Sequence, residues 1–127
     1  MNRSREEKVA IIMAKHIVDK YNCKCKPIQF AGNNYLYICN KKFDLLITVC
    51  DTNEKKCIKI EEILINEKYR NKGICTELIN TIKEVSDEYN VTVGLWSRIN
   101  DFRLFNFYTK LGFIHTETLR DYWLEYN

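Results

Sequence analysis

The stretch that decides the fold reads CIKIEEILINEKYRNKGIC and spans residues 57–75. Its first part, Ile58 to Ile65, is rich in β-branched residues, which indicates a buried strand. A polar and basic connection follows and ends at Gly73. From Ile74 to Tyr89 the apolar residues recur at helical spacing on one face, which predicts an amphipathic helix. The stretch therefore predicts a strand, a basic turn and a helix in succession.

This succession is suited to holding an anion at the start of the helix. The first backbone N–H groups of a helix have no partner within it, and the helix dipole favours negative charge at that end. Gly73 lets the backbone approach a bulky phosphate closely. Arg70 and Lys72 add positive charge. The turn lacks the second glycine of a Walker P-loop and two of the three glycines of a Rossmann fingerprint, so it is neither of these motifs.

Two motifs in this order resemble those of the GNAT N-acetyltransferase superfamily. The first, Arg/Gln-x-x-Gly-x-Gly/Ala after a strand, stands here as RNKGIC at residues 70–75, with Cys75 where glycine or alanine is usual. The second, FYTKLGF at residues 107–113, is similar to the family's Leu/Phe-Tyr-x-Lys-x-Gly-Phe segment. The resemblance covers residues 58–113 well and residues 1–50 poorly. It implies the GNAT fold, a mixed α/β architecture with a central, mostly antiparallel sheet, one parallel strand pair and flanking helices.

The rest of the chain supplies the elements that this fold needs. Helices are expected at residues 5–21 and 101–111, the first with Ser4 as N-cap and Glu7 at the capping-box position. Residues 21–26 are interpreted as a polar connection, and Pro27 permits only an edge or starting position in a strand. Strand 91–96 is expected to run parallel to strand 57–65 through a right-handed crossover. The remaining strands are expected at residues 28–30, 35–39, 43–50, 113–119 and 122–126.

Composition and charge narrow the class of protein. The chain has 127 residues, 46% of them hydrophobic and 13% aromatic, which predicts one packed domain over residues 1–127. A net charge of +3 suits a phosphate-bearing ligand and does not by itself predict nucleic-acid binding. No apolar run reaches membrane-spanning length, and residues 1–8 lack the apolar core of a signal peptide, so we expect a cytoplasmic protein without a membrane segment. A homodimer stays open.

The cysteines and histidines show no metal-ligand spacing. No Cys-x-x-Cys pair occurs, and His16 and His115 lie far from the cysteines, so we expect no metal site. His16 shares the apolar face of helix 5–21 and is interpreted as a residue at the edge of the core rather than a catalytic base. The thiols are expected to be reduced and to form no disulfide. The six cysteines are Cys23, Cys25, Cys39, Cys50, Cys57 and Cys75.

The resemblance implies acetyl-coenzyme A as the cofactor. By that resemblance the backbone N–H of Ile63 donates to the oxyanion, and the two residues after it pair with the pantetheine arm as an added strand. Gly94, inside a strand, indicates a bulge or a close approach by another backbone or by the ligand. Asn100 or Asp101 and Lys110 are further candidates for cofactor contacts. The expected cofactor-binding residues are Ile63, Leu64, Ile65, Arg70, Asn71, Lys72, Gly73, Ile74, Cys75 and Thr76.

Acetyl transfer from a thioester to an amine needs a base and an acid. The amine must lose a proton, because a free lysine has a pKa of about 10.4. Glu61 is expected to share its face of the strand with Ile63 and Ile65, and it matches the carboxylate that faces the amine in the similar spermidine/spermine acetyltransferases. Glu62, expected on the opposite face, is the second candidate. Two surface charges remain the alternative interpretation.

The acid is expected to be Tyr108. It occupies the position of the family's general-acid tyrosine, and a phenol with a pKa of about 10 is protonated at neutral pH. A tyrosine that only packs in the core is the alternative.

These residues favour an acetyl-coenzyme A-dependent N-acetyltransferase that transfers acetyl directly to an amine held near Glu61. The acceptor is an amine of a small molecule or of a protein. Two other hypotheses stay open. One is a GNAT-like binding module that has lost turnover. The other is a phage-type or toxin-type effector that acetylates a protein lysine or an aminoacyl-tRNA.

Overall fold

A computed structural model describes residues 3–127; Met1 and Asn2, two of the residues on which the expectation about a signal peptide rests, lie outside the described residues. The predicted order of elements is confirmed, with a short 3-10 turn, η1 (Glu67–Tyr69), before the second helix. The helices and strands are α1 (Arg5–Tyr21), β1 (Lys24–Phe30), β2 (Asn33–Cys39), β3 (Phe43–Asp51), β4 (Lys56–Ile65), α2 (Ile74–Tyr89), β5 (Val93–Ser97), α3 (Phe102–Lys110), β6 (Ile114–Thr118) and β7 (Tyr122–Tyr126).

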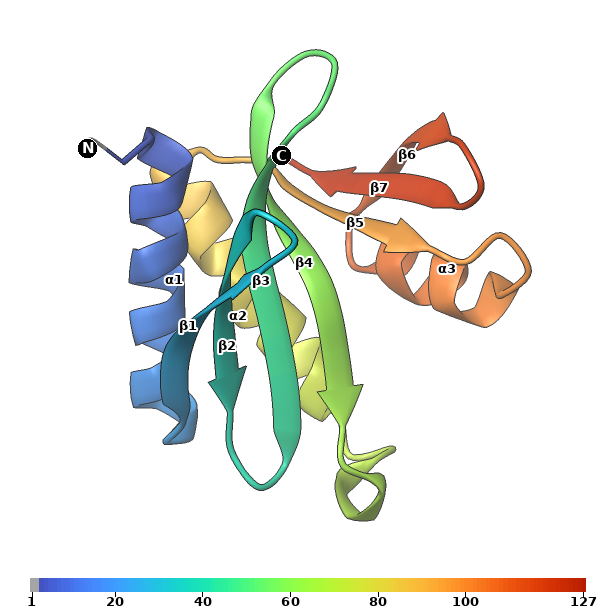
Figure 1. The fold of residues 1–127 in the computed structure, drawn as a ribbon. Coiled ribbons are helices and arrows are strands. Elements are labelled where there is room, and N and C mark those ends of the chain that lie inside the picture. The colour runs from blue at the N-terminus through green and yellow to red at the C-terminus, as the bar shows by residue number, and fades with distance from the viewer. Residues whose placement is uncertain (1–2) are drawn as a thin grey trace.

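The seven strands form one sheet in the order β1-β2-β3-β4-β5-β7-β6 (Figure 1). Strands β4 and β5 run parallel, and the other neighbouring strands run antiparallel. The predicted fold class, a mixed α/β architecture with a mostly antiparallel sheet, one parallel pair and flanking helices, is therefore confirmed. No helix within residues 3–127 is long and apolar enough to span a membrane.

Strand β1 is longer than the sequence suggested. The interpretation of residues 21–26 as a connection is wrong from Lys24 onward, because Lys24 to Lys26 pair with Tyr37 to Cys39 on β2. Backbone pairing at an exposed edge needs no apolar side chains. The polar composition of residues 24–26 therefore gave no signal for a strand. Pro27 lies on this edge strand, as predicted, where a missing N–H costs least.

The core lies between the sheet and helices α1 and α2, which also pack against each other. Alternate residues of β3 and β4, among them Leu45, Ile47 and Ile58, are fully buried against apolar side chains of both helices. Burying one such side chain contributes about 1.5–3 kcal/mol. The predicted capping box of α1 is present, with Ser4 Oγ accepting from the Glu7 N–H at 3.1 Å. His16 is exposed, so its interpretation as a core-edge residue is wrong.

Candidate functional site

Strand β4 contains a β-bulge at Glu61. Its neighbours Ile60 and Glu62 face consecutive residues of β3, Ile47 and Leu46, so Glu61 has no partner across the ladder. A bulge inserts one extra residue and so changes which face the following side chains take. Directly paired residues of an antiparallel ladder lie on the same face.

The bulge reverses two expectations about the acidic pair. Ile63 faces Leu45 in the core, so the strand's apolar residues stay on the core face on both sides of the bulge. Glu61 instead forms an ion pair with Lys59 at 2.9 Å, and Lys59 faces Thr48 on the side of the sheet away from the helices. The expectations that Glu61 shares a face with Ile63 and lies opposite Glu62 are therefore wrong.

Strands β4 and β5 form a fork. They pair at only two positions, Ile58 with Val93 and Lys59 with Gly94, and then diverge (Figure 1). Ile63 lies five residues after Ile58, and one of these five is the bulged Glu61. Ser97 lies four residues after Val93, the partner of Ile58. The two residues therefore stand at the same level on the two arms of the fork. Within residues 3–127, Ser97 Oγ is the one buried side-chain polar atom without a hydrogen-bond partner.

The turn between β4 and α2 leaves the helix N-terminus open. Gly73 and Asn71 have φ angles of +79° and +62°, a left-handed conformation that glycine adopts without strain and asparagine tolerates. No side chain caps α2. Its first hydrogen bond runs from the Glu77 N–H to the Gly73 carbonyl at 3.0 Å, so the N–H groups of residues 74–76 precede the ladder. Arg70 Nε donates to the Ile65 carbonyl at 3.1 Å, which ties the turn to the end of β4.

A pocket of about 460 Å³ lies between this N-terminus and the end of β4. Nine of the ten expected cofactor-binding residues line it, and Lys72, the tenth, is exposed on the turn. Two further lining residues, Tyr69 and Phe107, were not expected there. The lining residues are Ile63, Leu64, Ile65, Tyr69, Arg70, Asn71, Gly73, Ile74, Cys75, Thr76 and Phe107.

Tyr108 follows Phe107 on α3 and is 8% exposed. Its ring packs edge-on against Phe107 and Phe113, with centroid distances of 5.2 and 5.7 Å. Burial raises the pKa of Tyr108 above the ordinary value for a phenol, and the neighbouring Cys75 thiol adds to the increase. Burial likewise raises the pKa of Cys75 to about 11. Tyr108 is therefore protonated at neutral pH, beside residues that line the pocket.

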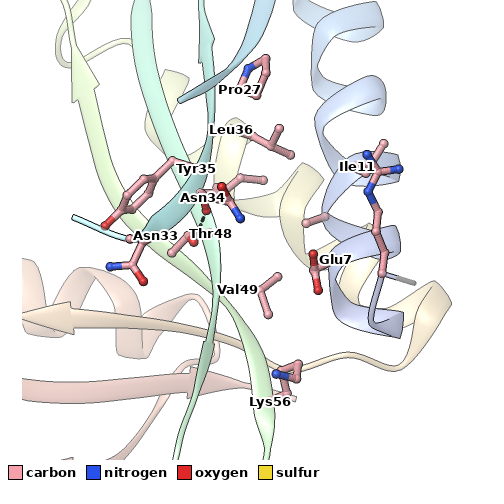
Figure 2. Close-up of a pocket in the computed structure, with 14 residues that line it drawn as sticks. Glu7, Ile11, Pro27, Asn33, Asn34, Tyr35, Leu36, Thr48, Val49 and Lys56 are labelled. Carbon is pink, nitrogen blue, oxygen red and sulfur yellow. Dashed lines mark hydrogen bonds between the residues drawn. The ribbon is translucent and has the colours of Figure 1, made fainter. Parts of the chain in front are cut away.

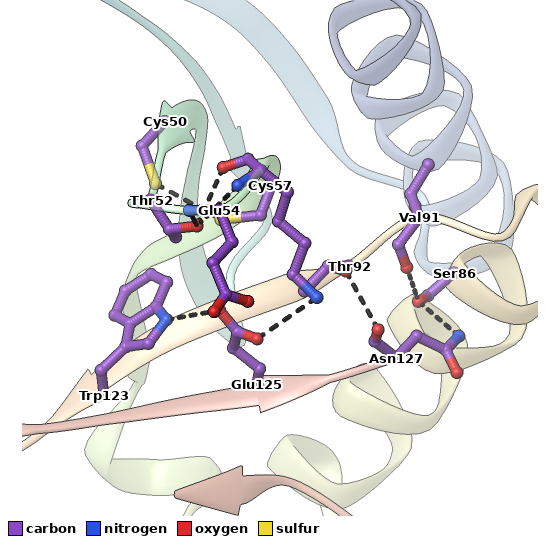
Figure 3. A network of polar contacts seen from close by, with 11 residues as sticks. Cys50, Thr52, Glu54, Cys57, Ser86, Val91, Thr92, Trp123, Glu125 and Asn127 are labelled. Carbon is purple, nitrogen blue, oxygen red and sulfur yellow. Dashed lines mark hydrogen bonds and ion pairs between the residues drawn. The ribbon is translucent and has the colours of Figure 1, made fainter. Parts of the chain in front are cut away.

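Gly94 lies directly against the side chain of Trp123. A Cβ atom at this position would clash with the ring of Trp123 on β7. Trp123 packs against Trp96 with a centroid distance of 5.0 Å, and its Nε1 donates to Glu125 at 2.8 Å (Figure 3). Glu125 also forms an ion pair with Lys55 at 3.5 Å. The close approach expected at Gly94 is therefore present, and the Trp123 side chain makes it.

The remaining candidates lie outside the pocket lining. Asp101 caps α3 by accepting from the Leu104 N–H at 3.0 Å, which gives it a structural role. Asn100 and Lys110 are exposed. Sequence reasoning missed Ser97 because a serine at the end of a strand carries no signal of its own. Tyr69 and Phe107 carried a weak signal, since Tyr69 precedes the first motif and Phe107 is the first residue of the second.

A second cavity of about 440 Å³ lies between α1 and strands β1 to β3. Figure 2 shows Glu7 and Ile11 of α1 on one side of it and Leu36 and Val49 of the sheet on the other. Its volume is close to that of the pocket at the α2 N-terminus, so size does not distinguish the two cavities. The α1 N-terminus beside it is already capped by Ser4 and Glu7. The pocket at the uncapped N-terminus of α2 is therefore the better candidate for binding an anionic ligand.

Residues 3–127 contain no cluster of three or more side chains suited to holding a metal ion.

A search of curated protein sequences found no match. Among solved structures, Naa50 of Arabidopsis thaliana, in complex with a bisubstrate analogue, superposes with a TM-score of 0.60 at 16% identity over 99% of this chain and 96% of its own. A GNAT family acetyltransferase of Elizabethkingia anophelis with acetyl-CoA bound gives 0.57 at 12% identity over 82% and 97%.

PH1933 of Pyrococcus horikoshii gives a TM-score of 0.58 at 18% identity over 72% of this chain, and the match spans 62% of the length of that protein. At such identities these likenesses establish the fold alone. The acetyltransferase (GNAT) family model matches residues 35–113, which include the fork, the turn and the pocket. The chain therefore belongs to the GNAT acetyltransferase family.

Proposed function

We propose that this protein is an acetyl-coenzyme A-dependent N-acetyltransferase that passes acetyl directly to an amine. The observation that carries the proposal is the uncapped N-terminus of α2, which opens into a pocket lined by the end of β4, the turn before α2 and Phe107. Open N–H groups, the helix dipole and the Arg70 guanidinium favour the phosphates of a coenzyme. The family match over residues 35–113 adds independent support.

The residues present fit this coenzyme. The N–H groups of residues 74–76 would hold its phosphates, and the edge of β4 at Leu64 and Ile65 would bind the pantetheine arm by backbone hydrogen bonds. Ser97 offers a buried hydroxyl without a partner on the opposite arm. When bound, acetyl-coenzyme A supplies an activated acetyl thioester. We assign the oxyanion donor to the backbone N–H of Ile63.

The acid in this proposal is Tyr108. Its raised pKa makes it a weaker acid than an ordinary phenol. The same burial also makes a neighbouring thiolate more basic, as the raised pKa of Cys75 shows. A leaving thiolate beside Cys75 would therefore be basic enough to accept the Tyr108 proton.

The base in this proposal is Glu61. The bulge turns its carboxylate to the face away from α1 and α2, so the amine would approach from that face and the coenzyme from the pocket. Both would meet at the fork, which favours direct transfer without a covalent enzyme intermediate. Lys59 forms an ion pair with Glu61 at 2.9 Å and would compete with the acceptor for it. The acceptor is an amine of a small molecule or of a protein.

Release of free thiol from acetyl-coenzyme A in the presence of a panel of amines tests this function. The panel comprises polyamines, amino acids and lysine-containing peptides. The proposal expects amine-dependent thiol release and a mass increase of one acetyl group on the accepting amine. Binding of acetyl-coenzyme A without release for any amine would favour the hypothesis of a binding module.

A further inference from the structure

Two cysteines stand directly opposite each other on the β3–β4 hairpin. Cys50 and Cys57 are paired across the ladder, and their sulfur atoms are 3.4 Å apart (Figure 3). Directly paired residues in an antiparallel ladder have Cα atoms about 4.5–5.5 Å apart, which lies within the range that a disulfide spans. Both thiols are free in the structure.

The pair differs in access and in reactivity. Cys57 is fully buried, whereas Cys50 is partly exposed. The hydrogen bond from the Cys57 thiol and the charge of Lys59 lower the pKa of Cys50. That hydrogen bond and burial raise the pKa of Cys57. Cys50 is therefore the thiol that ionises and meets a reagent, and Cys57 is placed to react with the product.

The other cysteines lack this arrangement. On the neighbouring β1–β2 hairpin, Cys25 faces Ile38 and Cys39 faces Lys24. Cys75 lies on the first turn of α2, and burial raises the pKa of its thiol. The pairing of Cys50 with Cys57 is thus specific to one position in the sheet.

We propose that Cys50 and Cys57 form a redox-active dithiol site that peroxides oxidise to a reversible disulfide. The Cys50 thiolate attacks one peroxide oxygen, which breaks the O–O bond and leaves a sulfenic acid on Cys50 and a hydroxide ion. Cys57 sulfur then attacks the Cys50 sulfur and displaces the sulfenic oxygen as water. Two thiols and one hydrogen peroxide become one disulfide and two waters, so the sulfurs give up two electrons and the peroxide accepts them.

The disulfide would close the hairpin at the base of the fork. The turn between the two cysteines is held by the Thr52 N–H, which donates to the Lys55 carbonyl at 2.7 Å. Next to Cys57, the Ile58 N–H donates to the Thr92 carbonyl at 2.9 Å, where β4 begins to pair with β5. A bridge here restricts the unfolded chain and ties β3 to the strand that carries the bulge.

Titration of the full-length protein with hydrogen peroxide tests the proposal. We expect the number of thiols that react in denaturant to fall from the six free cysteines to four, with a mass loss of two hydrogen atoms. Peptide mapping should join residues 50 and 57, and dithiothreitol should restore both thiols. The oxidised protein should also melt at a higher temperature than the reduced protein.

Two matched variants complete the test. Cys50→Ser should keep all of its remaining thiols at the same peroxide dose, whereas Cys25→Ser should still lose two. A bridge between any other pair would overturn the proposal, as would irreversible oxidation of Cys50 without a bridge or an unchanged thiol count. None of these readouts depends on acetyl transfer, so a failure here is separate from a failure of the proposed function.

Discussion

The two cavities of this protein lie beside two helix N-termini that differ in one respect. At α1 the Ser4 hydroxyl and the Glu7 carboxylate occupy N–H groups at the start of the helix, and Glu7 also lines the adjacent cavity. At α2 the turn ends in Gly73, which has no side chain to cap the helix. A short local sequence thus decides whether a helix N-terminus is closed by the protein or left for a ligand.

The largest expected effect is a loss of turnover, without a loss of coenzyme binding at α2, when the hydroxyl of Tyr108 is removed. Tyr108→Phe removes one hydroxyl and keeps the packing of the ring, so acetyl-coenzyme A should bind as before. Turnover should fall by about 10²–10⁴-fold, the usual range for the loss of a general acid. Steady-state kinetics and calorimetric titration of the same preparation measure both. Unchanged turnover would show that Tyr108 only packs in the core.

Glu61→Gln tests the acceptor side of the fork. It keeps the shape of the side chain and removes its charge, so turnover should fall by about 10²-fold at neutral pH. If Glu61 acts as a base, the defect should shrink as the pH rises toward the pKa of the amine, because the amine is then already neutral. Glu62→Gln is the matched control and should retain turnover. A defect in Glu61→Gln that is constant with pH would leave only a binding role for the carboxylate.

Two glycines test the comparison of the two cavities, because Gly73 lines the pocket at α2 and Gly32 lines the cavity beside α1. Gly73 and Gly32 have φ angles of +79° and +80°, and a Cβ atom at either would meet nothing within 4 Å. Valine at each position therefore carries a similar backbone strain, on the order of 1–2 kcal/mol. Gly73→Val should weaken acetyl-coenzyme A binding by about tenfold or more in a thermal-shift titration, and Gly32→Val should not. Equal losses in the two variants would contradict the assignment of the pocket.

The smallest expected effect concerns Cys75 and pH. Burial raises the pKa of this thiol to about 11, whereas the unfolded chain ionises at its ordinary, lower pKa. The contribution of Cys75 to stability is therefore fully present below the unfolded pKa of about 8.5 and is lost as the pH rises through the folded value. Cys75→Ala should flatten this decline in urea denaturation between about pH 8.5 and 11. An identical decline in both proteins would assign the pH dependence to other groups.

Local signals made the turn and α2 predictable, because the apolar periodicity, Gly73 and the basic residues act within one short segment. The bulge at Glu61 was not predictable, since it depends on how β4 aligns with β3. The partnerless position of Ser97 was not predictable either, because it depends on the divergence of β5 from β4. The opposition of Cys50 and Cys57 did leave a signal, because the predicted strand 43–50 ends at the first cysteine and the predicted strand 57–65 begins at the second.

The central claim is that the open N-terminus of α2, and not the capped one of α1, receives the coenzyme. Titration of ¹⁵N-labelled protein with acetyl-coenzyme A, followed by amide chemical shifts, tests it most directly. The account predicts the largest shifts at the amides of residues 73–76, with those of residues 5–8 unchanged. Shifts that concentrate at residues 5–8, or no shifts at millimolar coenzyme, would contradict it.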